Sequence, residues 1–262
     1  MKTEHPSIRL PMADDSLPGV TVNDATLPQL VTPRLLRVSE IDRDCSPTSS
    51  EARVLKWLRE FIGRPHPQLG RSGTICPFVP TALDLNNIWI TEIAERTPSV
   101  ESITSIITQY RNVFLETEPT QGVEMMTKAF LVAFPWLSAN GPEGTAIIDQ
   151  VQYRLKPHFV EKGMMLGEFH ATNDSPGLRN PDFRPLRSPI PMLVIRHMVE
   201  SDLPFMTRAR YTPKERSIFL RSYLFRLGGA LRQSSFDEAL ACLITAEASL
   251  SPSGSNDGYT AK

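Results

Sequence analysis

One short segment, AFLVAF at Ala129–Phe134, is apolar at every position. A strand with one face in water alternates between apolar and polar residues, so a continuous apolar run is typical of a central strand that is covered on both faces. Pro135 ends the run, because proline cannot donate a hydrogen bond to a strand ladder. The rest of the chain therefore has to supply layers for both faces of a sheet.

Amphipathic segments that can supply these layers lie on both sides of the run. Their apolar residues recur three or four positions apart, which is the period of a helix with one buried face. Ser50 and Thr212 are the expected N-caps of two of them, and Pro213 follows at the first helical position. We expect helices over Ser50–Ile62, Pro98–Phe114, Pro142–Leu155, Thr212–Leu227 and Ser235–Ala248.

Strand character recurs in three further segments, which are rich in β-branched, aromatic or other apolar residues: Asn86–Ile93, Met164–Phe169 and Met192–Ile195. Strands joined by helices favour a mixed sheet with helices packed on it. We therefore expect an α+β fold in a single domain with a mixed four-stranded sheet. A long loop rich in Arg and Pro is expected between the last two strands.

The two ends of the chain lack a sustained hydrophobic period. We expect a poorly ordered N-terminal arm over residues 1–49, the α+β domain over residues 50–248, and a disordered tail over residues 249–262. Within the arm, Leu27–Val38 has two alternatives, which are local packing and addition of an edge strand to the sheet.

Composition excludes several classes of protein. The net charge of −1 gives no sign of binding to nucleic acid or to an anionic membrane surface. No apolar run reaches about 18 residues, so no membrane span is expected, and the polar N-terminus does not have the pattern of a secretory signal. Three widely spaced cysteines argue against a disulfide framework, and a cytoplasmic setting is the expectation.

Chemistry-bearing residues gather in Gly163–Phe205, around the predicted long loop. Loops of this length in a compact domain are uncommon unless they bind something or are disordered. His170 follows the first strand, where catalytic and ligand-binding groups are often placed, but a packed histidine bonded to backbone is the alternative. The arginines Arg179, Arg184, Arg187 and Arg196 could bind carboxylates or phosphates, or form salt bridges within the loop.

Cys76 is the other candidate, as a ligand or nucleophile beside Pro77, although a lone cysteine more often packs as a small apolar residue. Basic and aromatic residues also alternate over Arg208–Arg226, a pattern that fits a packed amphipathic helix better than a nucleic-acid contact. Sequence motifs of dinucleotide-binding, P-loop, zincin and α/β-hydrolase sites are absent.

Three longer segments carry a family resemblance: HPQLGRSGTICPFVPTAL at 66–83, GMMLGEFH at 163–170 and the stretch at 180–205. They resemble an uncharacterised domain family of microbial genomes with an HPxLGRxGxxCPFxP signature, over about residues 52–210. This resemblance implies no settled activity.

A more distant resemblance is to the YqcI/YcgG family, which includes haem-dependent enzymes that N-hydroxylate arginine-type amino acids. Cys76-Pro77-Phe78 corresponds to its Phe-Pro-Cys segment, in reversed order, and Gly167–His170 to its Gly-x-His-Pro segment, with Ala171 in place of the proline. The later family segment, with Ser and Arg residues before a Pro-led apolar strand, corresponds to Ser175, Arg179 and Pro191–Ile195.

This resemblance implies a haem-binding, oxygenase-like enzyme that acts on a small amino-acid-like or amine substrate in secondary metabolism. His170 would be the catalytic residue and axial metal ligand. Cys76 would line the pocket or replace His170 as ligand, and the cofactor-binding set would be completed by Arg179, Arg187, Arg196 and His197.

Two alternatives stay open. One is a metal-free enzyme that binds an anionic small molecule through the arginines, with His170 as general base. The other is a non-catalytic binding protein of a biosynthetic cluster. The expected partner is a small-molecule substrate, with a homodimer as an open option and with neither nucleic acid nor membrane.

Overall fold

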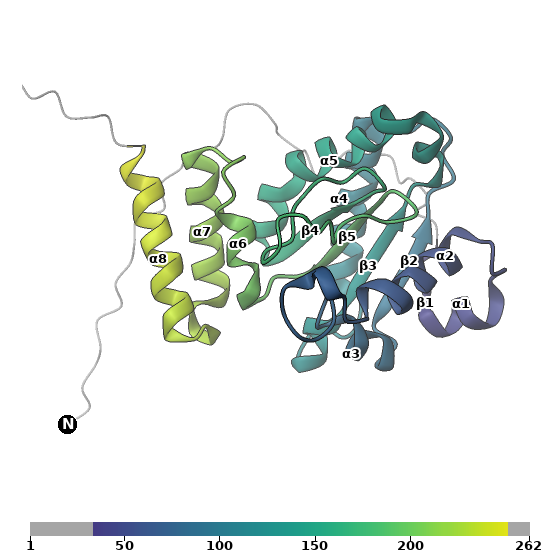
Figure 1. The fold of residues 1–262 in the computed structure, drawn as a ribbon, viewed down its shortest axis with the longest axis horizontal. Coiled ribbons are helices and arrows are strands. Elements are labelled where there is room, and N and C mark those ends of the chain that lie inside the picture. Colours follow the sequence, from purple (N-terminus) through teal and green to yellow (C-terminus); the bar gives the residue numbers. More distant parts are fainter. Residues whose placement is uncertain (1–33, 251–262) are drawn as a thin grey trace, which may run out of the picture. The chain divides into compact units, whose positions relative to one another are not determined.

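Five strands form a mixed sheet within residues 34–250, the part of the chain that the computed structural model describes (Figure 1). The strands lie in the order β1-β2-β3-β5-β4, with β2 and β3 parallel and all other neighbours antiparallel. Their bounds are Leu36–Arg37 (β1), Ile88–Glu92 (β2), Ala129–Ala133 (β3), Met164–Phe169 (β4) and Met192–His197 (β5). The α+β class and the mixed sheet are confirmed, whereas the expected count of four strands is wrong.

The fifth strand, β1, lies in the segment that was expected to be a poorly ordered arm, and it confirms for Leu36–Arg37 the alternative of an edge strand within Leu27–Val38. Leu36 and Arg37 of β1 pair with β2, and the helix α1 (Val38–Asp44) follows directly and buries Val38 and Ile41. The expected arm over residues 1–49 therefore extends too far, because residues 34–49 belong to the fold. A strand of two residues is too short to show an alternating pattern. The rest of the arm and the tail beyond residue 250 lie outside the described residues.

Five longer helices agree in position with the predicted ones. They are α2 (Ser50–Trp57), which a π-helical turn continues over Leu58–Ile62, α4 (Val100–Glu116), α5 (Gly141–Glu161), α7 (Pro213–Leu227) and α8 (Gln233–Ala248). Thr212 caps α7 as predicted, whereas the cap of α2 is Ser49 rather than Ser50. Two short helices were not predicted, α1 and α3 (Val79–Asp84). A third, α6 (Leu203–Met206), agrees with the short helical turn that the sequence favours after Asp202, although the Asp202 side chain does not form the cap hydrogen bond.

Both faces of β3 are covered, as its unbroken apolar run requires. On one face Phe130 and Val132 pack with residues of α4 and α5, among them Phe114 and Phe159. On the other face Leu131 packs with residues of α1, α2 and α3. Because these side chains are almost fully buried, replacing a central phenylalanine by alanine should cost about 3–5 kcal/mol of stability.

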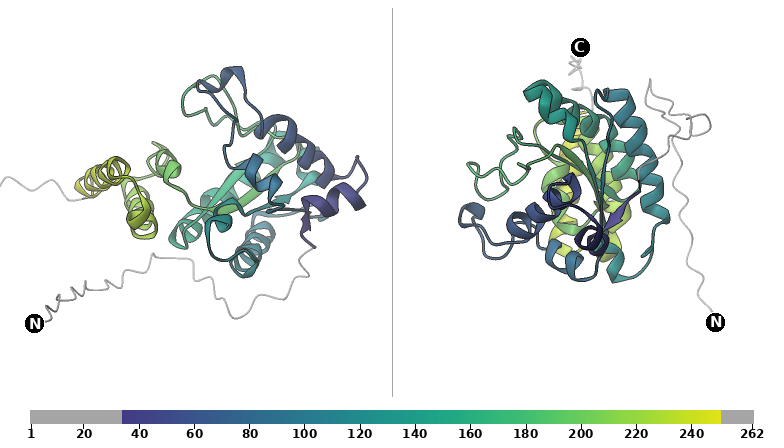
Figure 2. Two further views of the ribbon diagram at one scale, coloured as in Figure 1. Left: turned by 90° about the horizontal axis from the view of Figure 1, so that it is seen from below. Right: turned by 90° about the vertical axis from the view of Figure 1, so that its right-hand side faces the viewer.

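The helices α6 and α7 lie on the side of the edge strand β4, and α8 packs on the far side of α7 (Figure 1). Together with Met165 and Val160 these helices build a third apolar cluster. Figure 2 shows the same group of helices from two further sides. The strands β4 and β5 thus lie between this cluster and the helices α1–α3. The candidate site lies along these two strands. None of the helices in residues 34–250 combines the length and the apolar character that crossing a bilayer requires.

Candidate functional site

A cavity of about 890 Å³ extends from the face of the sheet that α2 and α3 cover, past the edge strand β4, to Gln152 and Lys156 of α5. Pockets that bind small organic molecules have volumes of roughly 300–1,000 Å³. Much of the wall is apolar, which favours a ligand with an apolar body. The apolar lining residues include Trp57, Leu58, Ile62, Ile75, Phe78, Val79, Leu131, Leu178, Leu186 and Val194.

Gly167 and Val194, which are paired across β4 and β5, contribute to the floor of the cavity. Gly167 has no side chain to fill the space above it. A Cβ atom at this position would lie 3.0 Å from Cε2 of Phe169, so the neighbouring ring would have to move. The absence of a side chain at Gly167 therefore lets the ring of Phe169 lie against the strand.

An ion pair lies on the floor next to them. Arg196 of β5 donates to both oxygens of Asp202, at 2.7 and 2.5 Å, and the Asp202 side chain is only 2 % exposed. Burial lowers the pKa of Arg196, but the charge of Asp202 and the nearby Cys76 raise it, and the net direction is upward. Asp202 also accepts from the backbone N–H of Val199. The positive charge of Arg196 is thus already balanced within the protein.

Two further arginines line the cavity at its β4 end. Arg210 donates to Oε1 of the buried Glu168 at 3.2 Å and to the hydroxyl of Tyr211 at 2.7 Å. Arg208 instead lies 4.8 Å from the ring centroid of Phe205 and, among the described residues, forms no ion pair within 4.0 Å. Burial lowers the pKa of Arg208, Glu168 offsets this in part and the charge of Arg210 lowers it again, so the net direction is down.

The connection between β4 and β5, residues 170–191, contributes Leu178 and Arg179 to the cavity. It is held against the segment that follows the π-helical turn. His66 stacks on Phe183 at 4.6 Å, and the Asn180 amide donates to the carbonyl of Gln68. These contacts bring together two of the segments that carry the family resemblance.

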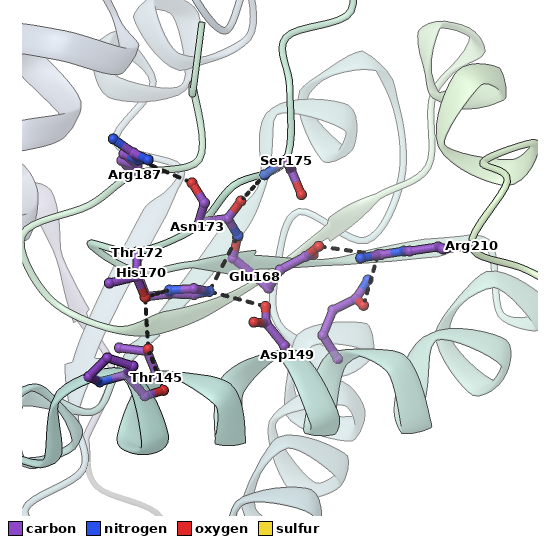
Figure 3. A network of polar contacts seen from close by, with 11 residues as sticks. Thr145, Asp149, Glu168, His170, Thr172, Asn173, Ser175, Arg187 and Arg210 are labelled. Atoms are coloured by element: carbon purple, nitrogen blue, oxygen red, sulfur yellow. Dashed lines mark hydrogen bonds and ion pairs between the residues drawn. The ribbon is translucent and has the colours of Figure 1, made fainter. Parts of the chain in front are cut away.

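His170 lies in a different environment, although it follows β4 as predicted (Figure 3). Its ring is 3 % exposed, and it does not line the cavity. Nδ1 lies 3.0 Å from the hydroxyl of Thr172, and Nε2 lies 3.1 Å from Oδ1 of Asp149 on α5. The hydroxyl of Thr172 in turn forms a hydrogen bond with the hydroxyl of Thr145 at the start of α5. Since both ring nitrogens have partners, His170 ties the end of β4 to α5.

The remaining predicted site residues divide between the cavity and other places. Cys76, Arg179 and Arg196 line the cavity. Arg187 lies outside it and donates to the carbonyl of Asn173 and to Asp174, so it orders the loop. His197 faces α4 on the opposite side of the sheet, where its ring lies 4.9 Å from that of Phe114.

Comparison with models of protein families assigns the chain to a family. A model described as "Domain of unknown function (DUF6875)" matches residues 51–236. The chain belongs to the DUF6875 family. The match spans every residue that lines the cavity except Glu238, and it agrees with the expected membership of an uncharacterised domain family. Comparisons with curated proteins and with solved structures find no match.

The donors of this DUF6875 domain fit the implied haem only in part. His170 does not fit as axial ligand, because both ring nitrogens are engaged and the ring lies outside the cavity. Cys76 does line the cavity, together with Arg179 and Arg196, so a thiol and two guanidiniums are present. Among the described residues no three His, Cys, Asp or Glu side chains come together as a metal site.

Sequence reasoning missed the β4 end of the cavity. Arg208 and Arg210 were assigned to the alternating basic and aromatic pattern over Arg208–Arg226, which was interpreted as a packed helix, whereas α7 begins only at Pro213. Lys156 and Glu168 were not singled out. A glutamate inside an otherwise apolar strand was the available signal, because a buried carboxylate needs a cationic partner.

Proposed function

We propose that this DUF6875 domain binds a small organic anion with an apolar body in the cavity between the sheet and the 170–191 connection. The observation that carries the proposal is Arg208, a partly buried guanidinium that lines the cavity and has no carboxylate at ion-pair distance among the described residues. A buried charge without a partner is costly. A carboxylate, sulfonate or phosphate of a ligand would supply the missing charge and accept two parallel hydrogen bonds.

The other charges of the cavity support the same reading of its chemistry. Three arginines have carboxylate partners there: Arg196 with Asp202, Arg210 with Glu168 and Arg232 with Glu200. Arg208 and Arg179 are left over, and Arg71 donates only to backbone carbonyls. The side chains that line the cavity therefore carry more positive than negative charge, whereas the net charge of the whole chain is −1. A local surplus of this kind selects anions and accelerates their binding.

A pair of matched fluorescent probes tests the proposal. The anionic probe is 1-anilinonaphthalene-8-sulfonate, and the neutral probe is N-phenyl-1-naphthylamine, which lacks only the sulfonate. We expect the wild-type protein to bind the anion more tightly than the neutral probe. Arg208→Gln should weaken binding of the anion about tenfold or more, since a hydrogen bond to a charged group contributes about 1.5–3 kcal/mol, and should leave binding of the neutral probe unchanged.

Arg187→Gln is the control, because Arg187 is an arginine of the same region that does not line the cavity. It should change neither affinity by more than about twofold. Equal binding of the two probes by the wild type, or equal losses in both arginine variants, would contradict the proposal.

A haem-dependent oxidation of an amino-acid-like anion is a second candidate, and the observation that favours it is the position of Cys76 on the cavity wall. Haem, when bound, would supply the oxygen chemistry, while Cys76 would hold the iron and Arg179 would pair with a carboxylate. Titration with ferric haem tests it. A saturable absorbance band near 400 nm that Cys76→Ala alters and His170→Ala leaves in place would support this form of the hypothesis. The absence of any band would reject it.

A further inference from the structure

Lys156 is a buried amine on the wall of the cavity that the proposed binding of an anion does not use. It comes from α5, is 2 % exposed and lies where the cavity reaches the edge strand β4. Its Nζ donates to the backbone carbonyl of Phe205 at 2.6 Å and lies 2.9 Å from the hydroxyl of Tyr211. Among the described residues no carboxylate lies within 4.0 Å of this nitrogen.

The surroundings of Nζ favour the neutral amine. The rings of Tyr211 and Phe219 lie 4.1 and 4.9 Å from it. Burial lowers the pKa of Lys156 to about 7, and the charge of Arg210 contributes to the shift. Arg208 also lowers it, whereas Glu168 and Asp202 raise it. A lysine that is desolvated and lies beside another cation is the usual form of a nucleophilic amine.

The hydrogen bonds agree with this. A neutral amine has two hydrogens and one lone pair, and the two oxygens of Phe205 and Tyr211 can accept the two hydrogens. The lone pair is then available on a residue that lines the cavity. The buried Lys128 also lines the cavity, and burial lowers its pKa to about 8, but its Nζ donates to two carbonyls at the end of α4, those of Phe114 and Thr117. Two carbonyls suit an ammonium ion that caps a helix, so Lys128 is the internal comparison for the labelling of Lys156.

We infer that Lys156 forms a Schiff base with the carbonyl carbon of a small 2-oxo acid or aldehyde whose anionic group is held by Arg208. This inference rests on the proposed function, since it needs the anion in the cavity. Nζ forms a bond to the carbonyl carbon, the carbon–oxygen bond breaks, and the oxygen leaves as water with the two hydrogens of the neutral amine. The step is balanced without an oxidant or a reductant. The Tyr211 hydroxyl lies next to Nζ and can exchange a proton with the reacting groups. Arg210 donates to this hydroxyl and can stabilise negative charge on it.

The test uses the wild-type protein and two matched acids. 4-Methyl-2-oxopentanoate has a carboxylate, a ketone and an apolar body, and 4-methylpentanoate lacks only the ketone. Each is first added to protein that holds the anionic fluorescent probe, to measure displacement. The oxo acid is then added with sodium cyanoborohydride, which reduces the C=N bond of a Schiff base to a stable amine. Intact mass and peptide mapping locate the adduct.

We expect both acids to displace the probe and one adduct per chain to form on Lys156, with Lys156→Met unlabelled. Between pH 6 and pH 8 labelling of Lys156 should rise about tenfold, because its pKa is about 7. An ordinary surface lysine with a pKa of about 10.4 should rise about a hundredfold over the same interval. Arg208→Gln should lower the yield on Lys156 about tenfold.

Each outcome decides between the two proposals. Displacement by both acids without an adduct on Lys156 would overturn the Schiff-base inference and leave the anion site intact. Labelling spread over several lysines with the steep pH dependence would also overturn it. If neither acid displaces the probe and Lys156 is not labelled, the Schiff-base inference fails, and the comparison of the anionic and neutral probes decides the anion site separately. The peptide map of the wild type gives these answers even if Lys156→Met does not fold.

Discussion

Two polar regions lie next to the edge strand β4, one around His170 and one around Arg208, and they differ in whether every polar group has a partner. Around His170, each side chain of the network has its partner: Thr172 and Asp149 engage both ring nitrogens, and Thr145 engages Thr172 (Figure 3). Around Arg208, one charge is missing, because the nearby carboxylate of Glu168 is paired with Arg210. A region whose polar groups are all satisfied stabilises the fold, and a region with an unpaired charge on a cavity wall invites a ligand.

The ion pair on the cavity floor should show the largest effect on stability. Asp202→Ala leaves Arg196, whose side chain is 29 % exposed, without its ion-pair partner and the Val199 N–H without its acceptor, which should cost about 3 kcal/mol. We expect a drop of this size in the free energy of unfolding, measured with urea. Asp174→Ala removes an exposed partner of Arg187 and should cost less than about 1 kcal/mol. Equal losses of stability in the two variants would contradict the structural role given to the pair of Arg196 and Asp202.

The His170 network should come next. His170→Ala removes a buried ring that contacts Thr172 and Asp149, and we expect a loss of about 2–3 kcal/mol in the free energy of unfolding. Asp149, whose side chain is 49 % exposed, can be solvated when its partner is lost, which limits the cost. A variant that keeps full stability would weaken the structural role given to His170.

Filling the cavity floor should affect binding more than stability. Gly167→Val adds atoms above the middle of the floor and crowds the ring of Phe169. We expect affinity for both the anionic and the neutral probe to fall about fivefold, corresponding to about 1 kcal/mol. Gly229→Ala is the control, because a Cβ atom there meets nothing within 4 Å. Unchanged binding in Gly167→Val would place the probe elsewhere.

The smallest effect concerns His197, on the opposite face of the sheet. Burial and the charge of Lys128 lower its pKa from 6.5 to about 4. Between these values the unfolded chain binds more protons than the folded one, so this residue makes stability fall as the pH drops from 6.5 to 4. The contribution should be about 1 kcal/mol, since the ring is partly exposed and screened. His197→Phe should flatten the pH dependence of the urea midpoint; an unchanged slope would assign the titration to other groups.

Much of the frame follows from short-range signals in the sequence. Thr212 and Pro213 mark the start of α7, and the unbroken apolar run of β3 predicts a strand covered on both faces, as found. The helix α3 was missed because Pro77 and Pro80 indicate a loop, although Pro80 lies in the first turn of the helix, where its missing N–H costs nothing.

The site depends on pairings that sequence spacing does not contain. His170 was correctly placed at a strand end, but its partner Asp149 comes from α5, and only the fold shows that both ring nitrogens are engaged. The role of each arginine is likewise decided by distance in space. Arg210 meets Glu168 from 42 residues away, and this pairing is what leaves Arg208 without a carboxylate.

The most direct measurement of the central claim compares Arg208→Gln with His170→Ala in two assays, affinity for 1-anilinonaphthalene-8-sulfonate and free energy of unfolding. We predict that Arg208→Gln lowers the affinity about tenfold and changes stability by less than about 1 kcal/mol. His170→Ala should lower stability by about 2–3 kcal/mol and leave the affinity of the folded protein within about twofold. The opposite pattern, with binding lost in His170→Ala and kept in Arg208→Gln, would contradict the account and move the site to the His170 network.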